Sequence, residues 1–354
     1  MNNEINSENI PLVSVCMITY NHEKYISQSI DGVLMQKTDF PIELVIGEDC
    51  STDNTRNLCM EYKEKYPDKI KLLLPEKNLG MIQNFNATIQ SCAGKYIALC
   101  EGDDYWIDPY KLQKQVDFLE ANPDFSFVYT DVDIYYEDIK YKQTAIIRNG
   151  ITFLDNDNPI KSRGYLANLT WLFRKTVLQL FSIENNCVDA ALFMFYEIAQ
   201  QTKIHYIPEV TGIYRKHLSS ASCHIDENKQ LQFELKAFEI QLNYVKKYKI
   251  EERISFPVLF QAATYLLEKA LGLNDKYVSE LLFVFFNQKN IMPEAIVNLL
   301  LQKQQEMRAI KASKAYQLGN FLLKPFAVLR KLGSTIRIFI LSFFCSLINK
   351  KQRR

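Results

Sequence analysis

The sequence predicts an α/β protein in which a doubly wound, mostly parallel sheet carries helices on both faces and is followed by an all-helical C-terminal region. Two observations predict this fold class. Apolar runs recur along the first 130 residues at about the length of a βαβ unit, with helical patterns between them. After about residue 226 only helical periodicity remains. We therefore divide the chain into residues 1–225 and 226–354, and the former into halves of about 11–131 and 132–225.

Five strands and four helices are expected in the first half. The strands are short apolar runs at residues 12–18, 42–46, 70–74, 96–100 and 125–130. The helices follow from apolar spacing, cap residues and prolines at their ends, at residues 26–34, 54–66, 80–91 and 109–121. Because parallel strands end at one edge of a sheet, we expect three polar segments to converge there: Thr19–His22, Glu48–Asp53 and Glu101–Asp104.

The second half has a looser pattern. Residues 134–147 are expected to form one or two strands, and residues 148–164 a polar loop. A strand at 168–173, a helix from Asp189 to about Gln201, a strand at 204–207 and an extended segment at 208–216 follow. The C-terminal region is expected to hold helices at residues 231–247, 257–270, 276–286 and 293–314.

Composition and charge are those of an ordinary globular chain. Of the 354 residues, 47% are hydrophobic and the net charge is +1, so no overall field favours nucleic acid as a partner. The eight cysteines include no Cys-x-x-Cys pair, and we interpret them as reduced core residues of a cytosolic protein. Residues 1–10 lack the basic-then-apolar order of a signal peptide, and no apolar run reaches the roughly 20 residues of a spanning helix.

Residues 96–106 concentrate the chemistry of the first half. An apolar run ends in Glu101, Asp103 and Asp104, three carboxylates within four positions. A divalent cation with oxygen ligands relieves the repulsion between such groups, so we expect a metal site that receives a diphosphate. The alternative is a solvated turn ahead of the helix that starts at Asp108-Pro109. The chain has no Gly-x-Gly pair and no Walker A loop, so carboxylates and metal would hold a nucleotide in place of a glycine cradle.

Six motifs along residues 11–220 resemble, in the same order, those of the bacterial family 2 glycosyltransferases of the GT-A fold. Each motif is weak alone, but the ordered set on alternating strands is specific. The resemblance implies that residues 1–225 form a GT-A domain whose first half binds a donor and whose second half binds an acceptor. The motifs are Val13-Ser14-Val15 leading to Thr19-Tyr20-Asn21, Glu48-Asp49-Cys50-Ser51-Thr52-Asp53, Asn78-Leu79-Gly80, Ala93-Gly94-Lys95-Tyr96, Glu101-Gly102-Asp103-Asp104-Tyr105-Trp106 and Tyr214-Arg215-Lys216-His217.

The resemblance implies a nucleotide site in the loops that follow the first strands. Tyr20 would pack on the nucleobase, and Asp49 would accept the N–H of a uracil-type base. The alternatives are loop packing for Tyr20 and helix capping for Asp49 and Asp53. The expected nucleotide-binding residues are Tyr20, Asn21, Glu23, Asp49, Asp53, Asn78, Gly80 and Asp103.

A metal site is implied at Glu101-Gly102-Asp103, which stands where the family has an Asp-x-Asp motif and departs from it in the first acid. Asp103 and His217 would bind Mn²⁺ or Mg²⁺ against the donor's two phosphates, with Asp104 beside them. The longer Glu101 would reach the ribose or a metal-bound water. Arg215 would contact phosphate bidentately.

The other histidines and the two tryptophans receive simpler interpretations. His22, His205 and His224 are interpreted as structural, because a histidine outside a matched motif is seldom a ligand. Trp106 and Trp171 would line the acceptor side or pack in the core.

The resemblance implies a catalytic base at the start of a helix in the second half. Asp189 fits, because it leads directly into the apolar helical segment from Ala190. It would take the proton from an acceptor hydroxyl as the oxygen attacks the anomeric carbon of the sugar. The alternative is that Asp189 only caps that helix, and Glu184 is the next candidate for the base.

The end of the chain changes character. From residue 301 onward there are twelve Lys or Arg residues and one acid, Glu306. The apolar segment 336–348 has basic flanks, which suits a helix that lies on an anionic membrane surface. The alternative is a helix that binds a partner or forms a homo-oligomer.

The combined interpretation is an inverting glycosyltransferase that moves a sugar from a UDP-linked donor to a saccharide or lipid-linked acceptor in surface polysaccharide synthesis. It would act in the cytoplasm at the inner face of the cell membrane. Two other classes stay open, a sugar-1-phosphate nucleotidyltransferase and a non-catalytic module that binds a sugar nucleotide or a partner. The former needs a glycine-rich loop after the first strand, where this chain has Thr19–His22.

Overall fold

The structure is a computed structural model of the chain. It describes residues 10–150, 158–162, 167–184, 187, 189–217, 220 and 226–273, together with residues 298, 302, 305, 306 and 309. Contacts within the chain separate two compact units, residues 1–224 and 225–354.

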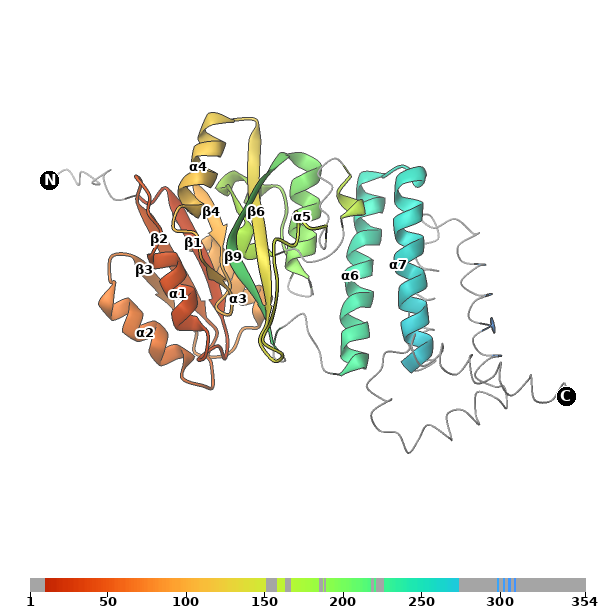
Figure 1. Cartoon of the computed structure of the whole chain (residues 1–354), viewed down its shortest axis with the longest axis horizontal. Helices are drawn as coiled ribbons and strands as arrows, with labels where there is room; N and C mark the ends of the chain where they lie inside the picture. Colours follow the sequence, from red (N-terminus) through yellow and green to blue (C-terminus); the bar gives the residue numbers. More distant parts are fainter. Residues whose placement is uncertain are drawn as a thin grey trace. The chain divides into compact units, whose positions relative to one another are not determined.

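The first unit is built on one sheet, in which the described residues form nine strands. Four parallel strands make up one side in the order β3-β2-β1-β4 (Figure 1). The chain moves outward from β1 to β3 and then returns to the other side of β1 as β4. This reversal opens a crevice at the carboxyl ends of β1 and β4, where open α/β sheets bind their ligands. The strands are β1 (Val13–Thr19), β2 (Ile42–Glu48), β3 (Ile70–Leu73) and β4 (Tyr96–Leu99).

The other side of the sheet is mixed. Strand β8 (Leu172–Arg174) lies antiparallel between β4 and β6 (Phe125–Tyr136), and β6 pairs in parallel with β9 (Lys203–Lys216). The short strands β5 (Tyr105–Trp106) and β7 (Tyr141–Gln143) pair antiparallel with β9 and β6. Strands β5, β7 and β8 therefore run opposite to the other six, so the predicted fold class, a mostly parallel sheet, is confirmed.

Several predicted bounds in this half are wrong. The segment predicted as a strand at 168–173 is mostly the 3₁₀ turn η3 (Asn168–Thr170), and β8 starts only at Leu172. Strand β6 extends six residues beyond 130, because β9 pairs with it along its whole length across a bulge near Asp131. The strand and the extended segment expected at 204–216 are one strand, β9. The two-residue β5 was not predicted, because it depends on pairing with distant β9.

Helices cover both faces of the sheet. The crossovers β1-α1-β2 and β2-α2-β3 advance in one direction, whereas β3-α3-β4 returns, so right-handed connections place α3 on the face opposite α1 and α2. Helix α1 packs against α2, and α3 contacts β1 and β2 (Figure 1). The side chains of β1 and β4 are accordingly almost all buried. The helices are α1 (Ile26–Leu34), α2 (Thr55–Lys65), α3 (Met81–Gln90), α4 (Lys111–Ala121) and α5 (Ala190–Gln201), and the other 3₁₀ turns are η2 (Pro159–Lys161) and η4 (Lys175–Gln179).

The second unit contains two long helices within its described residues, α6 (Glu227–Tyr248) and α7 (Glu252–Leu273). They pack together through buried apolar positions such as Leu231, Leu235 and Leu242, and Lys269 pairs with Glu234 at 2.7 Å. Helix α7 begins five residues before Pro257, so the predicted start at that proline is wrong. Pro257 lies inside the helix, in its second turn, so its missing N–H removes one intrahelical hydrogen bond.

The remaining predictions for this region fall on residues that the structure does not describe. They are the helix at 276–286, most of the helix at 293–314 and the basic apolar segment at 336–348. Among the described residues, no helix is both long enough and apolar enough to cross a lipid bilayer.

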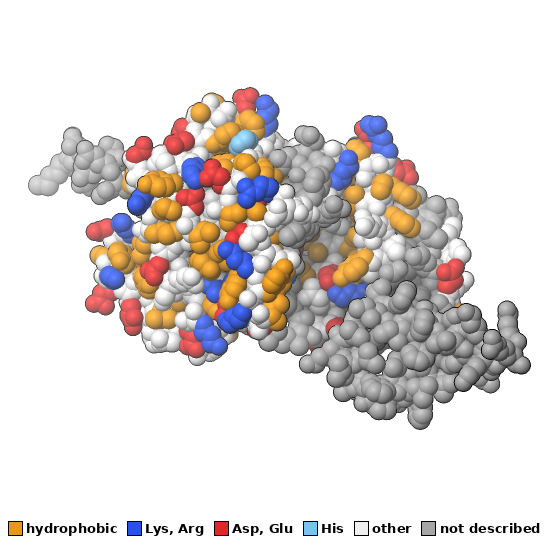
Figure 2. All heavy atoms as spheres, in the orientation of Figure 1, with side chains coloured by type: hydrophobic (Ala, Val, Ile, Leu, Met, Phe, Trp, Pro, Cys, Tyr) orange, Lys and Arg blue, Asp and Glu red, His pale blue; other side chains and the backbone are white. Residues whose placement is uncertain are grey.

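The surface and the cysteines agree with the composition. On the face drawn in Figure 2, the Lys, Arg, Asp and Glu side chains are interspersed, as expected for a net charge of +1. The described cysteines are free thiols that lie buried or half-buried: Cys16, Cys50, Cys59, Cys92, Cys100 and Cys187.

Candidate active site

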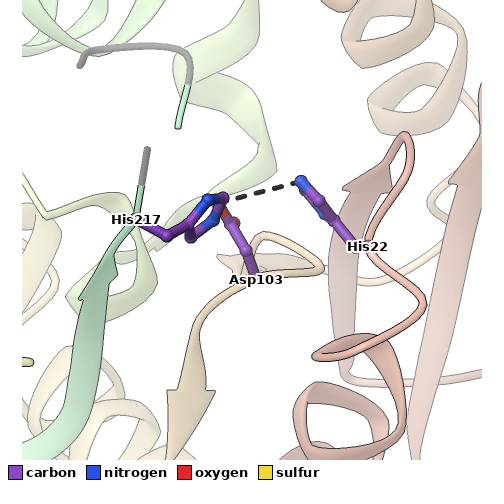
Figure 3. A group of neighbouring side chains, drawn as sticks. All are labelled: His22, Asp103 and His217. Atoms are coloured by element: carbon purple, nitrogen blue, oxygen red, sulfur yellow. Dashed lines mark hydrogen bonds and ion pairs between the residues drawn. The ribbon is translucent and has the colours of Figure 1, made fainter. Parts of the chain in front are cut away.

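Three segments that are far apart in the sequence meet at the crevice beyond the carboxyl ends of β1 and β4. The loop after β1 brings His22, the turn after β4 brings Asp103, and the end of β9 brings His217. Their side chains point toward one another (Figure 3), and one ligand atom of each lies within 4.8 Å of the others. Two imidazoles and a carboxylate are a donor set that divalent metal ions use, so these residues fit a metal ion.

The distances within this cluster are short. His217 Nε2 lies 3.1 Å and His22 Nε2 lies 3.8 Å from Asp103 Oδ2. Burial tends to raise the pKa of Asp103, but the two imidazoles outweigh it and the pKa lies below its usual value. Burial lowers the pKa of His22, which favours the neutral, metal-binding form of the ring. Asp103 and His217, predicted as a pair from the sequence, are thus brought together, and their metal role stays a prediction.

His22 was missed by sequence reasoning, which interpreted it as structural. The signal that could have found it is its position at the end of the Thr19–His22 segment, directly after β1 and opposite the turn that follows β4. The Thr19 hydroxyl lies 3.2 Å from Nδ1 of the His22 ring, which leaves Nε2 facing Asp103. A contact of this kind orients an imidazole that serves as a ligand.

Gly102 is the residue that lets these segments approach. A Cβ on Gly102 would lie 2.5 Å from the Thr19 hydroxyl oxygen and 3.1 Å from Nδ1 of His22. A larger residue would therefore push the loop that carries His22 away from Asp103.

Arg215 holds the acidic turn in place. Its backbone N–H donates to Asp104 Oδ1 at 2.7 Å, and its Nε donates to the carbonyl oxygen of Asp103 at 2.8 Å. The guanidinium also donates to Gln28 and Glu137. The predicted bidentate contact of Arg215 with phosphate would compete with these bonds. Burial, together with the neighbouring acids, raises the pKa of Asp104. This carboxyl is therefore better suited to its hydrogen bond within the turn than to binding a metal ion.

Glu101 is half-buried, and its carboxyl group lies against η3. Its Oε1 accepts a 2.7 Å hydrogen bond from Nδ2 of Asn168. Within the described part of the chain, its Oε2 and the Oδ1 of Asn168 have no hydrogen-bond partner. Burial, joined by Asp103, raises the pKa of Glu101 to about 7. Glu101, the residue that differs from the family's Asp-x-Asp motif, is therefore a carboxyl group that is hydrogen-bonded to Asn168 of η3.

Most of the predicted nucleotide-binding residues build the two loops beside the crevice. Asn21 and Glu23 accept hydrogen bonds from the backbone N–H groups of Thr52 and Asn54, so the loop after β1 is joined to the loop after β2. Asp53 binds the N–H of Glu23 and caps α2 through Thr55, as the capping alternative proposed.

Asp49 and Tyr20 sit differently in these loops. Both carboxylate oxygens of Asp49 accept backbone N–H groups, from Leu79 at 2.7 Å and Gly80 at 2.9 Å, and Nδ2 of Asn78 donates to the carbonyl oxygen of Asp49. Gly80 has a φ of +84°, which favours glycine. Tyr20 is 42% exposed, so its ring is free to receive a base.

Asp189 caps helix α5. Its Oδ1 accepts the backbone N–H of Leu192 at 2.9 Å, so the capping alternative describes it correctly. Burial raises the pKa of this carboxyl, which makes it a stronger base once it is ionised. Capping and catalysis are compatible, because a carboxylate has a second oxygen. The catalytic role stays a prediction.

The two tryptophans belong to the core, so of the two predicted alternatives core packing is correct and acceptor-side lining is wrong. Trp106 and Trp171 are 2% and 1% exposed. Nε1 of Trp106 donates to the carbonyl oxygen of Leu169 at 2.7 Å, and the ammonium of Lys111 lies 4.3 Å from the centroid of its ring.

Comparison with solved structures identifies the fold. The S. aureus TarS structure of residues 1–349 in complex with UDP-GlcNAc matches with a TM-score of 0.58 at 16% identity, over 87% of this chain and 92% of that one. This likeness shows that the chain has the GT-A fold that the sequence predicted.

Comparison with protein families and curated relatives identifies the family. The family model described as Glycosyl transferase family 2 matches residues 14–181. An uncharacterized Mycobacterium tuberculosis protein, Rv1520, is 32% identical over 205 residues, which are 58% of this chain and 59% of that protein. The Escherichia coli UDP-Glc:alpha-D-GlcNAc-diphosphoundecaprenol beta-1,3-glucosyltransferase WfgD is 37% identical over 123 residues, 35% of this chain and 46% of that enzyme. The chain thus matches about three fifths or less of the length of these relatives, and residues 14–181 are the part of it that belongs to glycosyltransferase family 2.

Proposed function

We propose that this chain is an inverting, metal-dependent glycosyltransferase that uses a UDP-sugar. The observation that carries the proposal is the meeting of His22, Asp103 and His217 at the crevice of a family 2 domain. The WfgD relative is named for a UDP-glucose donor, and the TarS structure holds UDP-GlcNAc, which supports a UDP-linked donor here.

The donor would lie over the carboxyl ends of β1 and β4. Tyr20, exposed in the loop after β1, would pack on the base, while Asp49 and Asn78 hold the adjoining loop. Asp103 and His217 would hold Mn²⁺ or Mg²⁺, which neutralises the negative charge that grows on the leaving diphosphate.

Sugar transfer would be a single displacement. Asp189 accepts the proton of an acceptor hydroxyl while that oxygen forms a bond to the anomeric carbon. The bond from this carbon to the diphosphate oxygen breaks, and UDP leaves with the bonding electrons. Attack from the opposite face inverts the anomeric centre, so an α-linked donor gives a β-glycoside. Positioned proton transfer of this kind typically contributes about 10²–10⁴ in rate.

The acceptor would be a saccharide or a lipid-linked oligosaccharide of surface polysaccharide synthesis. The name of WfgD, which acts on a diphosphoundecaprenol-linked sugar, supports this class. The basic apolar segment at 336–348 would hold the enzyme on the anionic inner face of the cell membrane, in the cytoplasm.

The test is UDP release from a panel of UDP-sugars, with Mn²⁺ or with EDTA, by the wild-type chain and by Asp189→Asn. The account predicts release that requires the ion, and a loss of at least about 10²-fold in Asp189→Asn with unchanged UDP binding. A wild-type rate in Asp189→Asn would remove Asp189 from the mechanism. Binding of UDP-sugars without any turnover would support the non-catalytic module in its place.

A further inference from the structure

We propose that His22 is a third protein ligand of the divalent ion, and that the complete set binds Mn²⁺ before any nucleotide and in preference to Mg²⁺. This inference rests on the proposed function and deepens it, since the proposed site needs only Asp103 and His217. It assigns His22, a residue outside the acidic turn and outside the segment that ends β9, a direct part in the site.

The first support is the distance pattern. Ligand atoms about 2.1 Å from one ion lie roughly 3.0 Å apart when adjacent and roughly 4.2 Å apart when opposite. Asp103 Oδ2 lies 3.1 Å from His217 Nε2 and 3.8 Å from His22 Nε2, which falls inside this range. All three ligand atoms lie within 4.8 Å of one another, so small side-chain movements would bring them around one ion (Figure 3).

The second support is that His22 is held in a ligating orientation. Its Nδ1 faces the Thr19 hydroxyl at 3.2 Å, and its backbone N–H donates to the hydroxyl of Thr55 at 2.8 Å. The Thr55 contact fixes the backbone of His22 and the Thr19 contact fixes its ring, so Nε2 is left directed at Asp103. The close approach of Gly102 to both Thr19 and His22 keeps the ring against the acidic turn. An imidazole held through its other nitrogen is the usual arrangement of a metal-binding histidine.

The ligand types decide which ion the set prefers. Mg²⁺ prefers oxygen ligands, keeps several waters and is usually bound by one or two carboxylates plus substrate phosphates. Imidazole nitrogens suit transition-metal ions instead, and two histidines with one carboxylate leave coordination positions open. A site with His22 therefore holds Mn²⁺ through the protein alone, and the diphosphate would add its oxygens to an ion already in place.

The position of His22 has a consequence for donor binding. His22 lies two residues after Tyr20 in the loop that Asn21 and Glu23 join to the start of α2. An ion bound by His22 would therefore fix the loop that carries the expected base-stacking ring. The same ion would therefore contribute to binding at both ends of the donor. Its charge would attract the diphosphate, and the loop that it fixes would position Tyr20 against the base.

The experiment is a titration of the full chain with MnCl₂ in the absence of nucleotide, in which electron paramagnetic resonance follows free Mn²⁺. Wild type, His22→Ala, His22→Glu and Asp103→Asn are compared, with His205→Ala as the histidine control. His205 stacks on Phe118 and lies outside the cluster. Competition by MgCl₂ gives the ion preference, and the spin-echo modulation of bound Mn²⁺ reports directly bound imidazole nitrogens.

We expect His22→Ala to weaken Mn²⁺ binding at least about tenfold and to remove one of the two imidazole couplings. His22→Glu should recover binding in part and shift the preference toward Mg²⁺, which a merely structural histidine would not do. His205→Ala should bind Mn²⁺ like the wild type.

Wild-type Mn²⁺ affinity in His22→Ala, alongside its loss in Asp103→Asn, would overturn the assignment of His22 and leave the proposed function standing. Loss of binding in both His22→Ala and His22→Glu would also count against ligation. Tight Mn²⁺ binding by a chain that releases no UDP from any UDP-sugar would instead overturn the proposed function and leave the assignment of His22 in place.

Discussion

The pKa of each acid at this site depends on whether a neighbouring group compensates its negative charge. Asp103 is half-buried beside two imidazoles, which keep the pKa of its carboxyl low, whereas Glu101 has only the amide of Asn168 and its pKa rises to about 7. Two acids that are equivalent in the sequence pattern thus differ in charge at neutral pH. The one that stays ionised is the one that faces the histidines.

The sequence could identify the residue types of the site but not their environments. Asp103 and His217 were predicted because each lies in a matched motif, and the structure brings Asp103 Oδ2 and His217 Nε2 within 3.1 Å. The Thr19–His22 segment was expected to meet the acidic turn, but His22 itself was not predicted as a ligand, because the sequence does not show that its Nε2 faces Asp103. The sequence left both acceptor-side lining and core packing open for the two tryptophans, because an indole in a motif gives no sign of its burial.

Lys111 allows a prediction about pH. Its side chain is fully buried, donates to Oε1 of Gln115 at 2.7 Å and, among the described residues, pairs with no carboxylate. Burial lowers the pKa of Lys111 to about 7. Between pH 7 and about 10.5 the unfolded chain then binds one proton more than the folded chain, so folding stability should rise with pH in this window.

We expect Lys111→Met to remove this dependence. The free energy of unfolding of the wild type should gain about 1 kcal/mol per pH unit relative to the variant between pH 7 and 9.5. Urea unfolding followed by tryptophan fluorescence measures it, because both tryptophans lie in the first unit. The control is Lys114→Met on the same helix, where ion pairs with Asp108 and Glu209 raise the pKa of the lysine. If the free energy of unfolding varied with pH in the same way for the wild type and Lys111→Met, the lowered pKa of Lys111 would be contradicted.

At the scale of elements, the loops beside the crevice are built mainly by side chains that bind backbone N–H groups. Asp49 fixes Leu79 and Gly80, and Asn21 fixes Thr52. Such bonds explain why the matched motifs consist of short polar residues next to strand ends. The strands of the parallel half were predictable because each is a continuous apolar run. Strand β5 was not predictable and β8 was predicted with wrong bounds, because two or three residues carry no periodicity and only their neighbours define them.

Gly102→Ala tests how closely these elements must approach. The new Cβ would collide with Thr19, so we expect a loss of about 1–3 kcal/mol in the free energy of unfolding and a loss of at least tenfold in Mn²⁺ affinity. The control is Gly150→Ala. Gly150 has a φ of +72° and a Cβ there would meet no atom within 4 Å, so stability should fall by about 1 kcal/mol while Mn²⁺ affinity stays unchanged. Equal Mn²⁺ affinities in Gly102→Ala and the wild type would show that Mn²⁺ binding does not need the close contact between Gly102 and the loop of Thr19 and His22.

At the scale of the whole molecule, the family 2 domain and the C-terminal region have different sequence signals. The domain is recognised by ordered motifs and by the αβ alternation, whereas the region after residue 226 offers helical periodicity and a basic end. Periodicity predicted both α6 and α7 but placed both starts too late: α6 begins at Glu227 and not at residue 231, and α7 begins at Glu252 and not at Pro257.

The basic end gives a prediction of its own. The full chain should co-sediment with vesicles that contain anionic lipid, more strongly at low salt, and a chain that ends at Gly319 should not. Neutral vesicles serve as the control. Equal sedimentation of the two chains would dismiss the membrane role of residues 320–354 and favour the partner-binding alternative.

The most direct test of the central claim is the thermal stability of the chain against UDP-, GDP- and dTDP-sugars, with Mn²⁺ and with EDTA, for wild type and Asp103→Asn. A ligand at about 100 times its Kd adds about 2.7 kcal/mol, which raises Tm by several degrees. The account predicts that a UDP-sugar raises the Tm of the wild type only when Mn²⁺ is present, and that Asp103→Asn shows no such rise. A rise that persists in EDTA and in Asp103→Asn, or no rise with any nucleotide sugar, would contradict it.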